Sequence, residues 1–155
     1  MQLDLETAKR LLAAAENKAR QMNLASDIAI VDAGANLIAF HRMDGARIAG
    51  IGIAQDKAWT SVAMQMPTAN LTQAAQPNGP SFGINTTHQG RLVILGGGIP
   101  LVRDGRIVGG VGVSGGTSAQ DVEVANAAVQ AFEAMQAPGT TRGASARIGT
   151  AQFYG

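Results

Sequence analysis

The dipeptide Asp104-Gly105 lies between two strand-like runs and constrains the fold of this chain more than any other feature. An Asp-Gly pair flanked by apolar residues favours a two-residue hairpin turn, because both turn positions need a positive φ. The flanking runs, at 99–103 and 106–114, are rich in the branched residues that strands prefer. Because so short a turn joins only antiparallel strands, this half of the chain predicts an antiparallel sheet.

A second hairpin is predicted in the first half of the chain. Segment 32–36, Asp-Ala-Gly-Ala-Asn, concentrates residues that turns favour and separates predicted strands at 27–31 and 37–42. A further apolar run at 91–95 comes just before three successive glycines and is predicted as one more strand. These runs together predict five strands in one mostly antiparallel sheet.

Helices are predicted wherever apolar residues recur at helical spacing. The first runs from about residue 5 to 22 behind the capping residue Asp4, and the second covers about 46–64. A third follows Thr117, while 77–89 is predicted as a long loop. The expected order is α-β-β-α-loop-β-β-β-α, which indicates an α+β fold, a profilin-like layered sandwich with helices flanking the sheet.

The chain has 155 residues, which fits one domain, and we place that domain at 1–137. Residues 138–155 are predicted to form a C-terminal tail. The tail is small and polar until Phe153 and Tyr154. Two aromatic residues at its end indicate that it docks on the domain or on a neighbouring subunit.

Composition excludes several classes of function. Charged residues are 15% of the chain, against about 25% in a typical globular protein, so we expect part of the surface to be covered in a homo-oligomer. The net charge is +1 and basic residues form no run, which argues against nucleic-acid binding. The absence of cysteine excludes disulfides and zinc–thiolate sites. No signal-peptide or membrane-spanning pattern occurs, so the expected location is the cytoplasm.

Several motifs together resemble the GlcG/HbpS family, which includes the C-terminal domain of PduO-type proteins. Segments 28–34 and 37–46 are similar to the first hairpin of that family, and 53–58 is similar to its second helix. Segments 96–101 and 111–121 are similar to its glycine-rich strands and the start of its last helix. The resemblance covers roughly residues 3 to 135.

The resemblance implies a small-ligand-binding protein that forms homo-oligomers. It also implies that some members bind haem, while others are encoded in bacterial catabolic operons and one branch resembles enzymes acting on aromatic ring-cleavage products. Haem or a related tetrapyrrole is therefore the first candidate ligand. Because one fold supports many functions, two alternatives stay open: a small isomerase, deaminase or hydrolase acting on an unsaturated organic acid, and an accessory structural oligomer.

His41 and His88 are the histidines of the chain and its strongest potential iron ligands. Strand alternation places Phe40 and Arg42 on one side of the sheet and His41 on the other. His88 falls in the predicted loop. The alternative for each histidine is a surface or hydrogen-bonded structural role. The sequence lacks Cys-x-x-Cys-His, so covalent haem attachment is excluded.

The turn Gly115-Gly116-Thr117 leads from the last strand into a capped helix, where backbone N–H groups favour anions. Thr117 with Gln120 fits a capping box, and Asp121 adds a further polar group. The alternative is an ordinary capped helix. A second glycine-lined wall is predicted at Gly97 and Gly98, with a simple bulge as the alternative.

Arg42, Asp44 and Lys57 form the last candidate set. Arg42 and Lys57 are suited to grip an acidic ligand, since an arginine binds a carboxylate with two parallel hydrogen bonds. The alternative is a salt-bridge network, Arg42 to Asp44 or Lys57 to Asp56, that ties the second helix to the first hairpin.

Overall fold

The computed structural model describes residues 2–136, and the predicted tail at 138–155 lies outside the described residues. The elements follow one another along the chain as α1 (Leu5–Gln21), β1 (Asp27–Asp32), β2 (Leu37–Arg42), α2 (Ala49–Ala63), α3 (Ala69–Ala74), two 3₁₀ turns (Ile84–Thr86 and His88–Gly90), β3 (Gly98–Arg103), β4 (Arg106–Ser114) and α4 (Ser118–Gln136).

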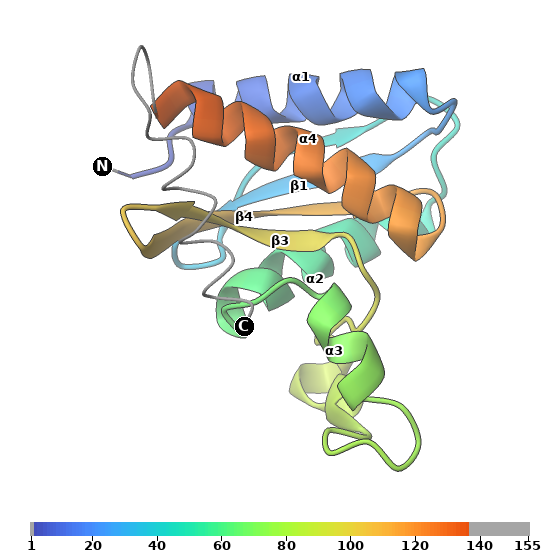
Figure 1. Ribbon diagram of the computed structural model, residues 1–155. Coiled ribbons are helices and arrows are strands. Elements are labelled where there is room, and N and C mark those ends of the chain that lie inside the picture. The colour runs from blue at the N-terminus through green and yellow to red at the C-terminus, as the bar shows by residue number, and fades with distance from the viewer. Residues whose placement is uncertain (1, 137–155) are drawn as a thin grey trace.

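One antiparallel sheet with strand order β2-β1-β4-β3 forms the middle layer. Helices α1 and α4 lie side by side on one face, and α2 covers the other (Figure 1). Helix α3 and the segment after it project away from this layered body (Figure 1). The predicted α+β class and both predicted hairpins are confirmed.

The prediction of five strands is wrong, because the sheet of the described residues has four. Segment 91–95 is not a strand, since its backbone polar groups bond to threonine side chains on the helices. The Thr60 hydroxyl accepts one N–H and donates to one carbonyl of this segment, at 3.1 and 3.2 Å. The hydroxyls of Thr68 and Thr72 donate to two more carbonyls. A strand neighbour is therefore not needed to satisfy the segment.

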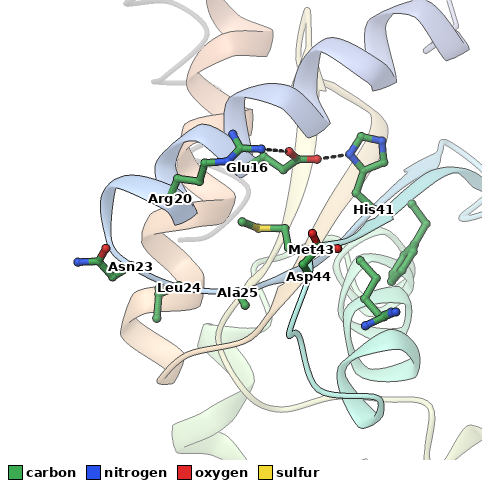
Figure 2. A pocket seen from close by; sticks show the side chains of 10 residues that line it. Glu16, Arg20, Asn23, Leu24, Ala25, His41, Met43 and Asp44 are labelled. Carbon is green, nitrogen blue, oxygen red and sulfur yellow. Dashed lines mark hydrogen bonds and ion pairs between the residues drawn. The ribbon is translucent and has the colours of Figure 1, made fainter.

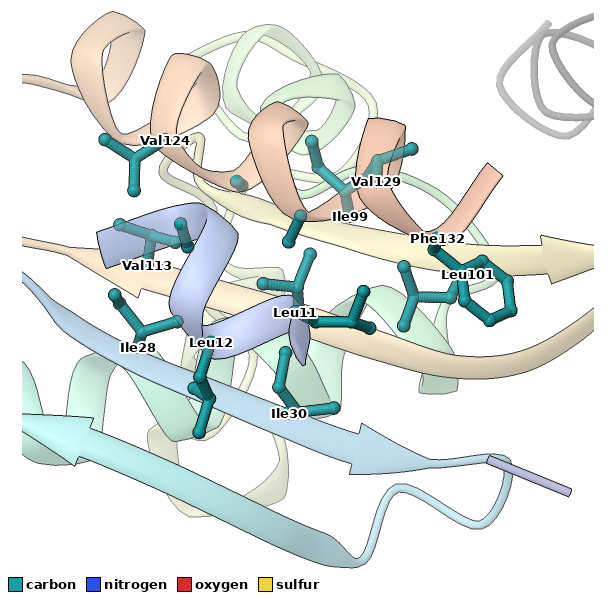
Figure 3. Close-up of a cluster of buried hydrophobic side chains, with 14 of the residues drawn as sticks. Leu11, Leu12, Ile28, Ile30, Ile99, Leu101, Val113, Val124, Val129 and Phe132 are labelled. Carbon is teal, nitrogen blue, oxygen red and sulfur yellow. The ribbon is translucent and has the colours of Figure 1, made fainter. Parts of the chain in front are cut away.

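The main core lies between the sheet and the pair α1 and α4 (Figure 3). Helix α1 starts at the predicted cap, where Asp4 Oδ1 accepts the N–H of Thr7 at 2.8 Å. Its apolar stripe then packs on branched residues of the central strands and on α4. The larger fully buried side chains of this core are Leu11, Leu12, Ile28, Ile30, Leu101, Val111, Val113, Val124 and Phe132.

On the other face, the glycines of β4 let the backbone of α2 lie almost directly on the sheet. A methyl group at Gly112 would overlap the Ala54 carbonyl oxygen, and one at Gly110 would lie 2.7 Å from the Ser61 hydroxyl. Such contacts are too short for any side chain, so these positions require glycine. The close neighbour of the glycine-rich strand is therefore α2.

Candidate functional site

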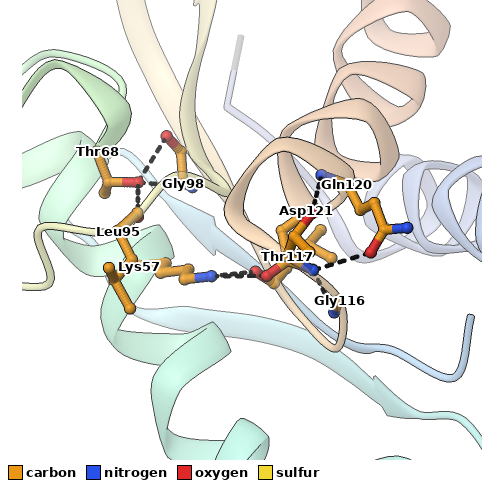
Figure 4. A network of polar contacts seen from close by, with 9 residues as sticks. Lys57, Thr68, Leu95, Gly98, Gly116, Thr117, Gln120 and Asp121 are labelled. Atoms are coloured by element: carbon orange, nitrogen blue, oxygen red, sulfur yellow. Dashed lines mark hydrogen bonds and ion pairs between the residues drawn. The ribbon is translucent and has the colours of Figure 1, made fainter. Parts of the chain in front are cut away.

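The close approach of α2 carries Lys57 into the interior, where its ammonium group meets Asp121 of α4 (Figure 4). Lys57 Nζ donates to Asp121 Oδ2 at 3.1 Å and to the Val113 carbonyl oxygen at 2.8 Å. The two side chains are 2% and 4% exposed. The pair thus joins helices on opposite faces of the sheet through a buried ionic contact.

Burial shifts the ionisation of both partners of this pair. It lowers the pKa of Lys57, while the charge and hydrogen bond of Asp121 oppose the shift. It raises the pKa of Asp121, while the Gly116 N–H and the charge of Lys57 act against the rise. Each charge is therefore costly to bury alone and is held by its partner.

The predicted anion cradle at the start of α4 is filled by the chain itself. The N–H of Gly116 donates to Asp121 Oδ1 at 2.8 Å, and the N–H of Thr117 donates to Gln120 Oε1 at 2.9 Å. The Gln120 N–H donates back to Thr117 Oγ1 at 3.2 Å, so the predicted capping box is present. The half-buried Gly115 packs against Ala25 and Ser26, just before β1. These donors already have partners.

Gly97 and Gly98 border the same network. A methyl group at Gly97 would lie 2.9 Å from Lys57 Nζ, and the Gly97 φ of +128° is itself a glycine conformation. Gly98 packs against the backbone of Lys57 and exchanges hydrogen bonds with Thr68 (Figure 4). Most predicted ligand residues therefore do come together, but in a closed internal network.

Arg42 and Asp44 lie elsewhere, so the predicted set of Arg42, Asp44 and Lys57 is divided. Both belong to the exposed end of β2 and the loop after it. Neither of the predicted salt bridges is found among the described residues. Lys57 pairs with Asp121 instead, and Asp56 pairs with Arg91 at 3.5 Å.

The end of β2 borders an open hollow of about 770 Å³ between it and the second half of α1 (Figure 2). This volume lies within the range of small-molecule and cofactor sites, about 300–1,000 Å³. Its walls combine charged side chains with apolar ones. They are formed by Glu16, Arg20, Asn23, Leu24, Ala25, Phe40, His41, Arg42, Met43 and Asp44.

A carboxylate orients the histidine of this hollow (Figure 2). His41 Nδ1 contacts Glu16 Oε1, and Glu16 Oε2 accepts from Arg20 Nη2 at 2.7 Å. A carboxylate offers no proton, so Nδ1 carries the hydrogen and donates it. In the neutral ring, Nε2 then keeps a free lone pair. The His41 side chain is 48% exposed, so that lone pair is accessible to a ligand.

The predicted strand alternation is confirmed around His41. His41 faces α1, whereas Phe40 packs against the α2 side of the sheet and Arg42 stands opposite Asp27 of β1. Asp27 is fully buried, and neither carboxylate oxygen has a hydrogen-bond partner within residues 2–136. Burial raises its pKa, while the charge of Arg42 opposes the rise.

His88 lies apart from His41, on the α2 side of the molecule. Its ring centroid is 5.4 Å from that of Trp59, and Arg91 stacks 4.3 Å above the same indole. It makes no ion pair with a carboxylate in the described part of the chain. Within that part, no group of three His, Cys, Asp or Glu residues is placed to hold a metal ion.

Sequence reasoning identified His41 but missed Glu16 and Arg20 of α1. A signal for them was present, because residues four apart on a helix share a face and carry a favourable Glu–Arg pair. Glu16 also borders the apolar stripe of α1, formed by Leu12, Ala15 and Ala19. What the sequence did not show is that β2 passes beside this face.

Comparisons with known proteins give the family. The model of the haem-degrading, HbpS-like proteins matches residues 3–130. The chain belongs to the GlcG/HbpS family. It is 38% identical over 130 residues to an uncharacterised 15.0 kDa protein of the dhaT–dhaS intergenic region of Citrobacter freundii, covering 84% of this chain and 92% of that one. It is 36% identical over 112 residues to the protein GlcG of Escherichia coli, covering 72% and 81% of the two chains.

Among solved structures, the PduOC–haem complex is a family member similar to this chain. It superposes with a TM-score of 0.81 at 36% identity and covers 84% of this chain and 95% of its own. Its ligand supports haem binding at the level of the family. None of the described helices of the present chain has the length and hydropathy needed to cross a membrane.

Proposed function

We propose that this GlcG/HbpS family member binds haem, or a related tetrapyrrole, in the hollow between α1 and β2, with His41 Nε2 as the iron ligand. The contact between His41 Nδ1 and Glu16 is the observation that carries the proposal. Metal-binding histidines usually donate their second ring N–H to a carboxylate or carbonyl, which fixes the tautomer and raises the basicity of the ligating nitrogen.

The other residues of the hollow fit this ligand. Leu24 and Met43 supply apolar surface for a macrocycle. Arg20 supplies a guanidinium group for a carboxylate of the ligand, since it keeps N–H donors beyond the one used by Glu16. When bound, haem would contribute an iron centre, while this chain would hold, orient and partly cover it.

His88 is the weaker candidate for an iron ligand, because no carboxylate of residues 2–136 orients its ring. An enzyme acting on an organic acid has no comparable support. The N–H groups and the lysine suggested for its anion site are already bonded within the chain.

The test is a hemin titration of the wild-type chain, His41→Ala and His88→Ala, followed at the Soret band. We expect His41→Ala to lose the shifted band or at least tenfold in affinity, about 1.4 kcal/mol. His88→Ala serves as the matched control and should bind like the wild type. Glu16→Gln should bind about 10- to 100-fold more weakly, because the tautomer is no longer fixed. Unchanged affinity in His41→Ala would refute the proposal.

A further inference from the structure

A small apolar pocket, here called the α4 pocket, lies between the start of α3, the edge strand β3 and α4. Its volume is about 160 Å³, and its walls include Pro67, Ala69, Ile99, Val122 and Val129. Ala69 is exposed and Val122 is half-buried, so the pocket opens to the surface. A dry apolar cavity of about 150 Å³ accepts one benzene molecule. The α4 pocket therefore has the size for one aromatic ring and is too small for a macrocycle.

One polar side chain, that of Asn126 on α4, stands among the described lining residues. It is exposed, so it lies at the mouth of the pocket. A carboxamide both donates and accepts hydrogen bonds, and no charged residue lines the pocket beside it. The best occupant is therefore an uncharged aromatic ring that carries one hydroxyl group. A tyrosine side chain has this combination, and its hydroxyl usually finds a partner when the ring is buried.

The chain carries a single tyrosine, Tyr154, in the segment that follows the described residues. Helix α4 is described as far as Gln136, and the dipeptide Pro138-Gly139 comes directly after it. Such a dipeptide favours a turn. A reversal at this point would direct the following residues back along α4, toward Val129 and Asn126.

We propose that Tyr154 of the same chain occupies the α4 pocket, with its ring against Val122 and Val129 and its hydroxyl bonded to Asn126. In this position the segment 138–155 fastens the start of α3 to α4. The family model matches residues 3–130, so this contact is a feature of the present chain beyond the family domain. The α4 pocket shares no lining residue with the hollow at His41, and the proposal does not depend on haem.

The length of the segment fits docking within one chain. Val129 and Val122 lie about 7 and 14 residues before Gln136, which is about 10–21 Å along the helix. About 17 residues connect Gln136 to Tyr154, and a flexible linker of that length has a mean end-to-end distance of about 20–25 Å. When the linker length matches the span, the local concentration of the tethered group is about millimolar. This exceeds the micromolar concentration of a second chain, so the pocket takes the tyrosine of its own chain.

Nuclear magnetic resonance of labelled tyrosine tests the contact in the full chain. Because Tyr154 is the one tyrosine, its ring gives a single set of signals. We expect these signals to differ in shift from those of a peptide of residues 148–155. Ala69→Phe, which fills the pocket from its rim, should move them to the peptide position. Ala13→Phe, the same change at an exposed position of α1 outside the pocket, should leave them in place.

Two results of this measurement would overturn the proposal. One is a wild-type signal at the peptide position, and the other is an unchanged signal in an Ala69→Phe chain with wild-type circular dichroism. Asn126→Ala tests the hydroxyl contact and should weaken docking about two- to tenfold, as expected for one hydrogen bond. An equal docked fraction in Asn126→Ala would contradict the assigned orientation of the ring.

Disulfide formation locates the segment without a variant that fills the pocket. The chain has no cysteine of its own, and Phe153→Cys places a thiol next to Tyr154. Together with Ala69→Cys it should form an intrachain disulfide at least tenfold faster than together with Ala13→Cys, on the helix that packs beside α4. An undocked segment would meet both positions at similar rates. Equal rates for the two pairs, or a disulfide that joins two chains, would overturn the proposal.

Discussion

Replacing Lys57 by Met should destabilise the fold strongly, because Asp121 would be left as a buried charge. Both side chains are almost fully buried, and their contact is 3.1 Å. Breaking one partner of a buried pair costs about 3–5 kcal/mol, against a total stability of about 5–15 kcal/mol for a typical domain. Met fills most of the volume of Lys57, so the loss reports mainly on charge and hydrogen bonding.

Urea unfolding followed by far-UV circular dichroism measures this loss. The double variant Lys57→Met with Asp121→Asn should lose less than the sum of the single variants, by about 0.5–3 kcal/mol. A Lys57→Met chain within about 0.5 kcal/mol of the wild type would refute the view that the ion pair closes the junction between α2 and α4.

Two further predictions concern the α2 side of the sheet. Gly112→Ala should cost at least 1–3 kcal/mol in urea unfolding, because the methyl group meets the Ala54 backbone, whereas Gly52→Ala in open space on α2 should stabilise the helix by up to about 1 kcal/mol. Burial raises the pKa of Asp27, so the folded wild-type chain binds the carboxyl proton of Asp27 more tightly than the unfolded chain does. The folded state therefore loses stability as the pH rises through that raised pKa. Asp27→Asn should lack this loss of stability. The measurement is the urea midpoint of both chains between pH 4 and 8, and a parallel fall in the two would contradict the argument.

The elements that local chemistry determines were predictable from the sequence. Asp104-Gly105 forms its hairpin with both residues at positive φ, as the turn type requires. Asp4 and Thr117 cap the helices expected of them. In each case the determining contact lies within a few residues along the chain.

Contacts between distant segments decided what the sequence could not predict. The run at 91–95 has strand composition, yet the hydroxyls of Thr60, Thr68 and Thr72 take its hydrogen bonds from α2 and α3. The residue types of this run indicate extended backbone, but they do not indicate which groups its N–H and C=O groups bond to. The same holds for Glu16, which lies 25 residues before the histidine that it orients.

Burial, rather than residue type, separates the two groups of candidate site residues. Lys57 and Asp121 carry charged groups that suggested an anion site, but they form an ion pair with each other inside the fold. Separating them would leave a buried charge without a partner. His41 has a carboxylate partner at Nδ1, and its side chain is 48% exposed. A site that must admit a ligand cannot have all its polar groups satisfied beforehand. By that criterion, we expect the proposed ligand site at β2 and not at the glycine-rich turn before α4.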